Sequence, residues 1–215
     1  MLLYYITDRQ QLGHDEGERR RRLLGKIEEA ACAGVDYIQL RERDLTTREL
    51  ETLAREVVEV VRSCRGTTRL LVNSRTDVAI AVGAAGVHLR SEDVSPADVR
   101  GVFEQAGLER PVVAVSCHSL ADVEAAEVAE ADFVVFGPVF GKMGSTAVAG
   151  TEALRAVCHR GANSGASRPI PVVALGGVTL QNAAACLAAG AAGVAAIRMF
   201  QENEVARVVG ALREL

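Results

Sequence analysis

The segment Pro171-Val172-Val173-Ala174-Leu175-Gly176-Gly177-Val178-Thr179 decides the fold of this chain. Its apolar run is rich in Val and Ala, too short for a helix and bordered by glycine, so it predicts a short buried strand. The Gly176-Gly177 pair would let the backbone approach a ligand closely, because no Cβ blocks the way. Thr179 would then cap the next helix, whose open N–H groups and dipole favour an anion. The segment therefore predicts a phosphate-binding loop between a strand and a helix.

A second segment of the same kind, residues 192–198, follows one helix later and ends on Ile197 and Arg198. In an eightfold (β/α)8 TIM barrel, the loops after strands seven and eight form the usual phosphate site. We therefore expect Gly176, Gly177, Ile197 and Arg198 to bind a phosphate group.

Six earlier strand–helix units would complete such a barrel. The predicted strands are residues 2–7, 35–41, 70–73, 86–89, 111–116 and 132–137. Helix signals follow them: Thr46 and Glu49 form a capping box, and Pro96 suits a first helical turn. An open doubly wound sheet would also explain the alternation, but it requires a glycine-rich loop after its first strand, where this chain has Thr7-Asp8-Arg9. We expect a single α/β TIM-barrel domain over residues 1–215.

Composition limits the function classes. The chain has 215 residues, of which 49% are hydrophobic and 24% charged, and its net charge of −4 argues against a nucleic-acid surface. No apolar run approaches the length of a membrane span. Five scattered cysteines, with neither metal-type spacing nor a signal peptide, predict reduced thiols in a cytoplasmic protein. We expect a small-molecule ligand and no nucleic-acid or membrane partner, and we allow for a homodimer.

Polar side chains stand at the predicted strand ends, where TIM barrels carry their active sites. Gln39 and Arg41 alternate along strand two, so both would point into the barrel. A buried arginine needs a partner, which would be either a ligand anion or an ion pair with Asp8 or Glu42. Asn73 would hydrogen-bond either a heterocyclic ligand or backbone groups.

His118 is the candidate acid/base catalyst, because histidine titrates near neutral pH and this one follows a strand end. Its alternative role is to cap the helix that begins at Ser119. His88 lies within an apolar run and is expected to be an interior histidine with its hydrogen bonds satisfied. Cys117 would point away from His118, so a Cys–His nucleophile is not expected.

Taken in order and spacing, these strand ends resemble the thiamine phosphate synthase superfamily, including its thiazole tautomerase branch. The similarity spans essentially the whole chain. The matching stretches are Tyr5-Ile6-Thr7-Asp8, Gln39-Leu40-Arg41-Glu42-Arg43-Asp44-Leu45, residues 72–79, Gly86-Val87-His88-Leu89, Ser116-Cys117-His118-Ser119-Leu120, Phe136-Gly137-Pro138-Val139-Phe140 and Val173-Ala174-Leu175-Gly176-Gly177-Val178-Thr179.

The resemblance implies substrate-binding roles for five residues. The synthase couples an aminopyrimidine pyrophosphate to a thiazole phosphate and uses Mg²⁺ to stabilise the departing pyrophosphate. Arg43 stands where the synthase has a pyrophosphate-binding lysine, and the loop after strand six lacks the family's Thr-x-Thr-Lys run. The substrate-binding residues that the resemblance implies are Gln39, Arg41, Arg43, Asn73 and Lys142.

The metal site that the resemblance implies is incomplete in this sequence. Ser74 replaces one of the two Mg²⁺-binding aspartates, and Asp93 matches the other, so Asp93 is a metal ligand only if Mg²⁺ is bound. Losing one carboxylate should weaken Mg²⁺ binding.

This combination is similar to the thiazole tautomerase branch, which keeps the phosphate site and moves a proton without a metal. We therefore expect a tautomerase-like isomerase of thiamine biosynthesis, with His118 transferring the proton and no cofactor. The alternative is a divergent thiamine phosphate synthase that uses Mg²⁺. A second alternative is a non-catalytic barrel that binds thiazole or thiamine phosphates and acts through a partner.

Overall fold

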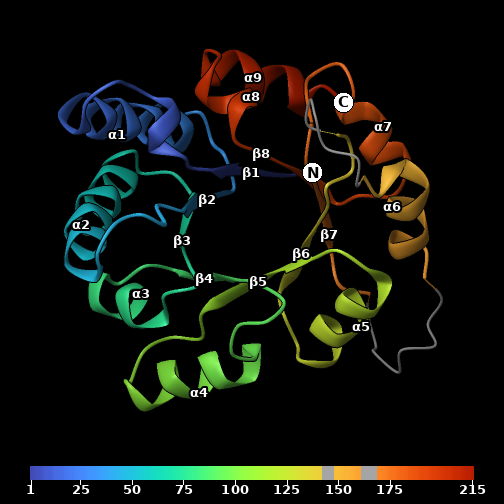
Figure 1. The fold of residues 1–215 in the computed structure, drawn as a ribbon, viewed down its shortest axis with the longest axis horizontal. Helices are drawn as coiled ribbons and strands as arrows, with labels where there is room; N and C mark the ends of the chain where they lie inside the picture. The colour runs from blue at the N-terminus through green and yellow to red at the C-terminus, as the bar shows by residue number, and fades with distance from the viewer. Residues whose placement is uncertain (142–147, 161–168) are drawn as a thin grey trace. The chain divides into compact units, whose positions relative to one another are not determined.

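Eight short parallel strands alternate with helices in the computed structural model, which describes residues 1–141, 148–160 and 169–215. The strands are β1 (Leu2–Ile6), β2 (Tyr37–Leu40), β3 (Arg69–Asn73), β4 (Gly86–Leu89), β5 (Val112–Cys117), β6 (Phe133–Phe136), β7 (Val172–Leu175) and β8 (Gly193–Ala196). They form a closed barrel in sequence order, so the predicted TIM barrel is confirmed (Figure 1).

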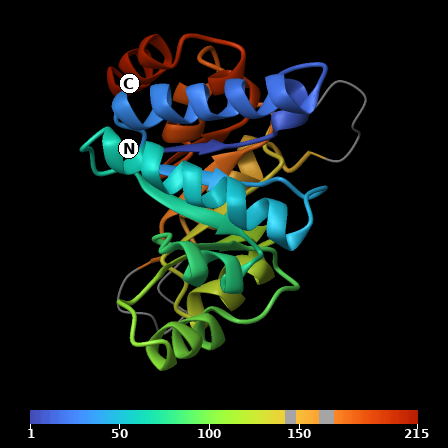
Figure 2. The same ribbon diagram turned by 90° about the vertical axis from the view of Figure 1, so that its left-hand side faces the viewer.

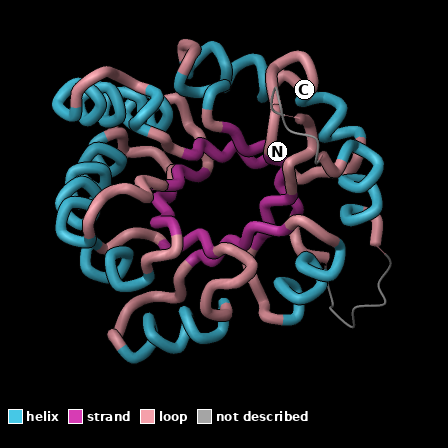
Figure 3. Tube along the Cα trace, viewed as in Figure 1, coloured by secondary structure: helices cyan, strands magenta, loops and turns pink. Residues whose placement is uncertain are grey.

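Helices follow the strands along the chain, as the trace in Figure 3 shows. In the described residues they are the 3-10 helix η1 (Arg9–Gln11) and the α-helices α1 (Glu16–Cys32), α2 (Thr47–Ser63), α3 (Thr76–Val82), α4 (Pro96–Gln105), α5 (Leu120–Val128), α6 (Gly150–Cys158), α7 (Ala183–Ala188), α8 (Arg198–Gln201) and α9 (Val205–Arg213). None of them has the length and apolar character that a membrane span requires.

The described residues group into two compact units, one of residues 3–87 with 197–215 and the other of residues 1–2 with 88–196. That the chain is one domain over residues 1–215 stays a prediction. In the first unit, β1 pairs with β2 in the register Ile6 to Gln39, and β2 pairs with β3. Helices α1 and α2 lie side by side against these strands (Figure 2). In the second unit, β5, β6, β7 and β8 pair in order.

The strands are buried on both faces, as parallel strands under a layer of helices should be. In β2, Ile38, Gln39 and Leu40 are all at most 1% exposed. Local signals account for the helix starts: the predicted Thr46–Glu49 capping box is present at α2, and Pro96 occupies the first turn of α4 after a Ser95–Asp98 box. Ser119 caps α5 in the same way.

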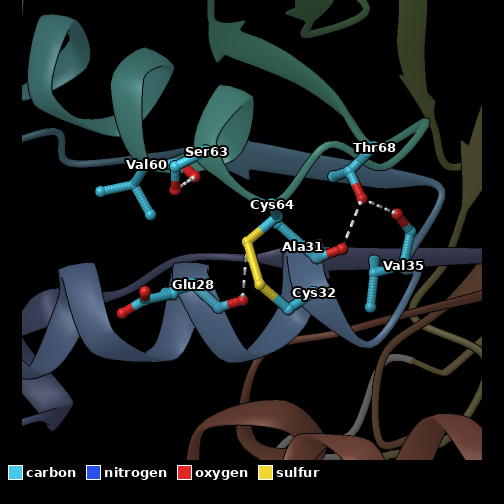
Figure 4. The surroundings of a disulfide bond; sticks show 8 residues. All are labelled: Glu28, Ala31, Cys32, Val35, Val60, Ser63, Cys64 and Thr68. Atoms are coloured by element: carbon cyan, nitrogen blue, oxygen red, sulfur yellow. Dashed lines mark hydrogen bonds between the residues drawn. A yellow bond between two sulfur atoms is a disulfide. The ribbon is translucent and has the colours of Figure 1, made fainter.

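A disulfide joins Cys32, the last residue of α1, to Cys64, which caps the end of α2 (Figure 4). The two Cα atoms are 5.0 Å apart, within the range that a disulfide needs. The expectation that all five thiols are reduced is therefore wrong for this pair, because the packing of α1 against α2 brings together two cysteines 32 residues apart. The other three cysteines are free thiols.

Candidate active site

The loop after β7 has its carbonyl oxygens bound by protein donors. The Leu175 carbonyl accepts from Val139 N–H at 2.8 Å, and the Gly176 carbonyl accepts from Phe140 N–H at 2.9 Å. The Gly177 carbonyl accepts from the Asn182 side-chain amide at 2.9 Å. A trans peptide directs its N–H opposite to its C=O, so the N–H groups of Gly177 and Val178 point away from these donors.

Those two successive N–H groups donate to no acceptor within residues 1–141, 148–160 and 169–215. Successive free N–H groups in a turn of this kind form a concave site for an anion. Phosphate binding by this loop stays a prediction, and its donors would be these two backbone N–H groups.

The backbone conformation and the close packing of this loop require glycine at both Gly176 and Gly177. Gly176 and Gly177 adopt φ values of 97° and 63°, a region that disfavours other residues. A Cβ on Gly176 would lie 2.5 Å from Pro138 Cα, and one on Gly177 would lie 2.8 Å from the Phe140 carbonyl oxygen. The expectation that glycine makes room for a ligand is thus incomplete, because the backbone after β6 makes the close approach that the structure shows.

Asn182 is a loop residue that the sequence analysis missed. Its side-chain oxygen accepts from Thr179 N–H at 2.8 Å while its amide donates to Gly177, so one side chain bridges the whole turn. Thr179 does not cap the helix as expected: α7 begins at Ala183, and Asn182 occupies the cap position. An Asn three residues after Thr179 is the sequence signal that could have indicated this turn.

The second predicted phosphate segment begins a helix of its own. Residues 198–201 form the short helix α8, with Ile197 at its cap position and Arg198 as its first, exposed residue. The sequence analysis placed both residues in a strand end and missed this helix, which is too short to show a periodic pattern. Arg198 forms no ion pair with any carboxylate in the part of the chain that the structure describes. A short extra helix after strand eight is a common phosphate-binding element of TIM barrels.

His118 follows the end of β5 and has its ring held in one orientation. Its Nδ1 lies 2.6 Å from the Gly137 carbonyl oxygen, which can only accept, so Nδ1 carries a proton. In the neutral ring Nε2 then holds the lone pair, as a general base requires. Ser119 and Asp122 cap helix α5, so the alternative role of His118 as the capping side chain is wrong.

The neighbouring candidates behave as expected. His88 is 2% exposed and its Nε2 lies 2.7 Å from the Ser116 hydroxyl, which makes it an interior histidine. Burial raises the pKa of the Cys117 thiol to about 12, so this thiol is not a nucleophile at neutral pH.

Arg41 has no ion-pair partner among the described residues, although it is half-buried at the end of β2. Burial, together with the nearby charge of Arg43, lowers its pKa, whereas Asp8 and Glu42 raise it only through distant attraction. The ion pair with Asp8 or Glu42 that the sequence left open is therefore absent. A half-buried cation without a carboxylate is suited to a ligand anion.

Glu42 is held by Arg9 instead, a residue that the sequence analysis missed. The Glu42 side chain is 1% exposed, accepts from the Thr7 hydroxyl at 2.5 Å and pairs with Arg9 Nη1 at 3.2 Å. Arg9 also forms two hydrogen bonds with Asp44, at 2.6 and 2.9 Å. Burial raises the pKa of Glu42 despite these partners, whereas Arg9 lowers the pKa of Asp44 to about 2.

The remaining substrate-binding candidates differ in exposure. Gln39 is 1% exposed, and its amide donates to the Tyr4 hydroxyl at 3.3 Å. Arg43 is exposed, and the half-buried Asn73 donates to the Ser74 hydroxyl at 3.2 Å. Lys142 lies outside the described residues. Gln39, Arg41, Arg43, Asn73, Ile197 and Arg198 belong to the unit of residues 3–87 and 197–215, and His118, Asp93, Gly176 and Gly177 belong to the other.

The residues at the implied metal position do not fit Mg²⁺ as they stand. The Asp93 carboxylate is bound by the Arg90 guanidinium through Nε at 3.1 Å and Nη2 at 2.8 Å. Within the described ranges, no three His, Cys, Asp or Glu side chains are grouped as metal ligands. Mg²⁺ requires oxygen ligands in octahedral geometry, and Ser74 supplies only a hydroxyl where the resemblance implies a carboxylate.

The chain is similar to known proteins over most of its length. The model of the family described as thiamine monophosphate synthase matches residues 3–200. A Geobacter sulfurreducens protein, provisionally named a thiamine-phosphate synthase, is 40% identical over 91% of this chain and 84% of its own length. The thiamine-phosphate synthase of Clostridium novyi is 32% identical over 94% of this chain and 91% of its own.

A solved structure supports the same assignment. The thiamine phosphate pyrophosphorylase of Pyrococcus furiosus superimposes with a TM-score of 0.78 at 29% identity, and the match covers 99% of this chain and 94% of that one. The chain therefore belongs to the thiamine monophosphate synthase family and is an enzyme of thiamine biosynthesis.

Proposed function

We propose that the chain is a thiamine-phosphate synthase, which joins an aminopyrimidine pyrophosphate to a thiazole phosphate and releases pyrophosphate. The observation that carries the proposal is the match, over nearly the full length of both chains, to proteins with that name. These names favour the synthase over the tautomerase that the sequence analysis put first.

The backbone N–H groups of Gly177 and Val178, which donate to no acceptor among the described residues, would bind the thiazole phosphate. They are dipoles fixed by the Asn182 bridge, so they need little reorganisation when the anion arrives. This assignment explains why the two amides donate to no acceptor in the described part of the chain.

Arg41 and Arg43 would bind the pyrophosphate group of the other substrate. The bond between the pyrimidine methylene carbon and pyrophosphate breaks, a new bond forms from that carbon to the thiazole nitrogen, and pyrophosphate leaves with the electron pair. The guanidinium groups of Arg41 and Arg43 would stabilise the negative charge that develops on the leaving pyrophosphate. No step is assigned to Mg²⁺, because the Asp93 carboxylate is already bound to Arg90.

Replacing Arg41 tests this assignment. Arg41→Gln should lower kcat/KM for the pyrimidine pyrophosphate by roughly 10- to 100-fold, the cost of losing a charge-assisted hydrogen bond to an anion. The KM of the Arg41→Gln variant for thiazole phosphate should change little. Arg48→Gln is the matched control, because Arg48 is exposed on the next helix. Equal kinetics for the Arg41 and Arg48 variants would remove Arg41 from the substrate site.

The thiazole tautomerase is the second candidate, and the orientation of His118 favours it. A ring fixed by Nδ1 with a lone pair on Nε2 is suited to moving a proton on a bound thiazole. His118→Asn keeps an N–H donor for the Gly137 carbonyl but removes the base. If the protein is a tautomerase, this variant should lose isomerisation while keeping ligand affinity; full isomerisation by the variant would exclude that role.

A further inference from the structure

The turn after β4 closes on itself through residues Arg90 and Asp93. Asp93 N–H donates to the Arg90 carbonyl at 3.1 Å, and Arg90 N–H donates back to the Asp93 carboxylate at 2.8 Å. The Arg90 guanidinium adds its bonds at 3.1 and 2.8 Å to the same carboxylate. Three donors from one residue thus occupy the carboxylate of Asp93.

The hydrogen bonds and the ion pair between Arg90 and Asp93, here called the Arg90–Asp93 clamp, join residues that are close in sequence. Its two residues are three positions apart, and a Ser95–Asp98 capping box with Pro96 fixes the start of α4 immediately afterwards. The Asp93 side chain is only 12% exposed, whereas that of Arg90 is 56% exposed. These bonds therefore join residues close in sequence, and they hold a largely buried carboxylate against the guanidinium of the same turn.

Arg90 is the cation that both acidic side chains of this turn contact. Arg90 also pairs with Glu92 at 3.1 Å, so a single guanidinium faces two carboxylates. A carboxylate offers about four lone-pair positions, and the three donors of Arg90 use most of them. An incoming Mg²⁺, which demands near-ideal octahedral geometry, would have to break these bonds first.

We infer that Arg90 takes the place of a divalent cation on Asp93, so that Arg90 itself limits the affinity of this chain for Mg²⁺. The resemblance to the family implies a metal ligand at Asp93, and the geometry instead gives that carboxylate an arginine. The inference concerns metal binding and holds for either of the two reactions, so its test does not depend on catalysis.

The test measures Mn²⁺ binding to the full chain by the loss of the free-ion electron paramagnetic resonance signal. Arg90→Gln should bind Mn²⁺ about two- to fivefold more tightly than the unchanged protein, the range that breaking an exposed ion pair allows. Adding Asp93→Asn to Arg90→Gln should abolish the gain. Arg55→Gln is the matched control, since it removes an equal charge from an exposed pair with Glu51.

Two results would overturn the inference. One is equal Mn²⁺ affinity for the unchanged protein and Arg90→Gln. The other is a gain that survives Asp93→Asn. Circular dichroism melting should accompany each titration, and Arg90→Lys provides a second variant if Arg90→Gln fails to fold. Lysine keeps the charge but lacks the forked donors, so its gain should be smaller than that of Gln.

Discussion

The Asn182 bridge predicts a selective loss of phosphate affinity when this side chain is shortened. Asn182→Ala removes the acceptor for Thr179 N–H and the donor to the Gly177 carbonyl, at 2.8 and 2.9 Å. Each such bond contributes about 0.5–1.5 kcal/mol, so holding the loop in its binding conformation loses roughly 1–3 kcal/mol. If that conformation must be restored on binding, the dissociation constant for thiazole phosphate should rise roughly 5- to 150-fold.

Isothermal titration calorimetry with thiazole phosphate and with the thiazole alcohol separates this effect from a general disturbance. Only the phosphate ester should lose affinity, because the loop contributes donors for the phosphate. Gln181→Ala is the control, since Gln181 is the exposed neighbour in the same turn. Unchanged affinity of Asn182→Ala for the phosphate ester, or an equal loss for the alcohol, would refute the argument.

Three further changes test the fold. Arg9→Met should destabilise the protein by about 3–5 kcal/mol in urea unfolding, since it leaves the buried Glu42 carboxylate without its cation; a loss below about 1 kcal/mol would contradict this. Asp44 has a lowered pKa of about 2, so it stabilises the fold above its ordinary pKa of 3.8, and this contribution disappears as the pH falls toward 2. Because Asp44 is 43% exposed, Asp44→Asn should lower the free energy of unfolding by only about 1 kcal/mol at pH 7. The stability of this variant should also fall less steeply in acid than that of the unchanged protein, and an equally steep fall would contradict the role of Asp44. Cys32→Ser should lower stability by about 3–4 kcal/mol, the loop-closure value for a 32-residue separation, and equal melting with and without reductant would argue against the disulfide.

The barrel was predictable because its signals are local. The capping box at Thr46 and the proline at Pro96 mark helix starts within four residues of chain, and short Val-rich runs mark the strands. Predicted boundaries were less accurate, as expected when strand ends are set by pairing: the run predicted from residue 35 forms a strand only over Tyr37–Leu40. The helix α8 was missed because its four residues show no period.

The site was predicted less completely than the fold. The strand-end rule selected Arg41 and His118 as candidates, but it could not tell whether Arg41 has a carboxylate partner. Arg41 lacks Glu42 as a partner because Arg9, which is 33 residues from Glu42 in the sequence, binds the Glu42 carboxylate in the folded chain. The Arg90–Asp93 clamp lies within four consecutive residues, but the resemblance to the family implied a metal ligand at Asp93 and not an ion pair with Arg90.

The proposal of a thiamine-phosphate synthase is tested most directly by ³¹P nuclear magnetic resonance. The protein is mixed with hydroxymethylpyrimidine pyrophosphate, thiazole phosphate and MgCl₂, and the phosphorus signals are followed over time. The proposal predicts that free pyrophosphate and thiamine phosphate appear in equal amounts, at a rate proportional to the protein concentration. A pyrophosphate ester that stays intact at saturating Mg²⁺ would contradict the synthase.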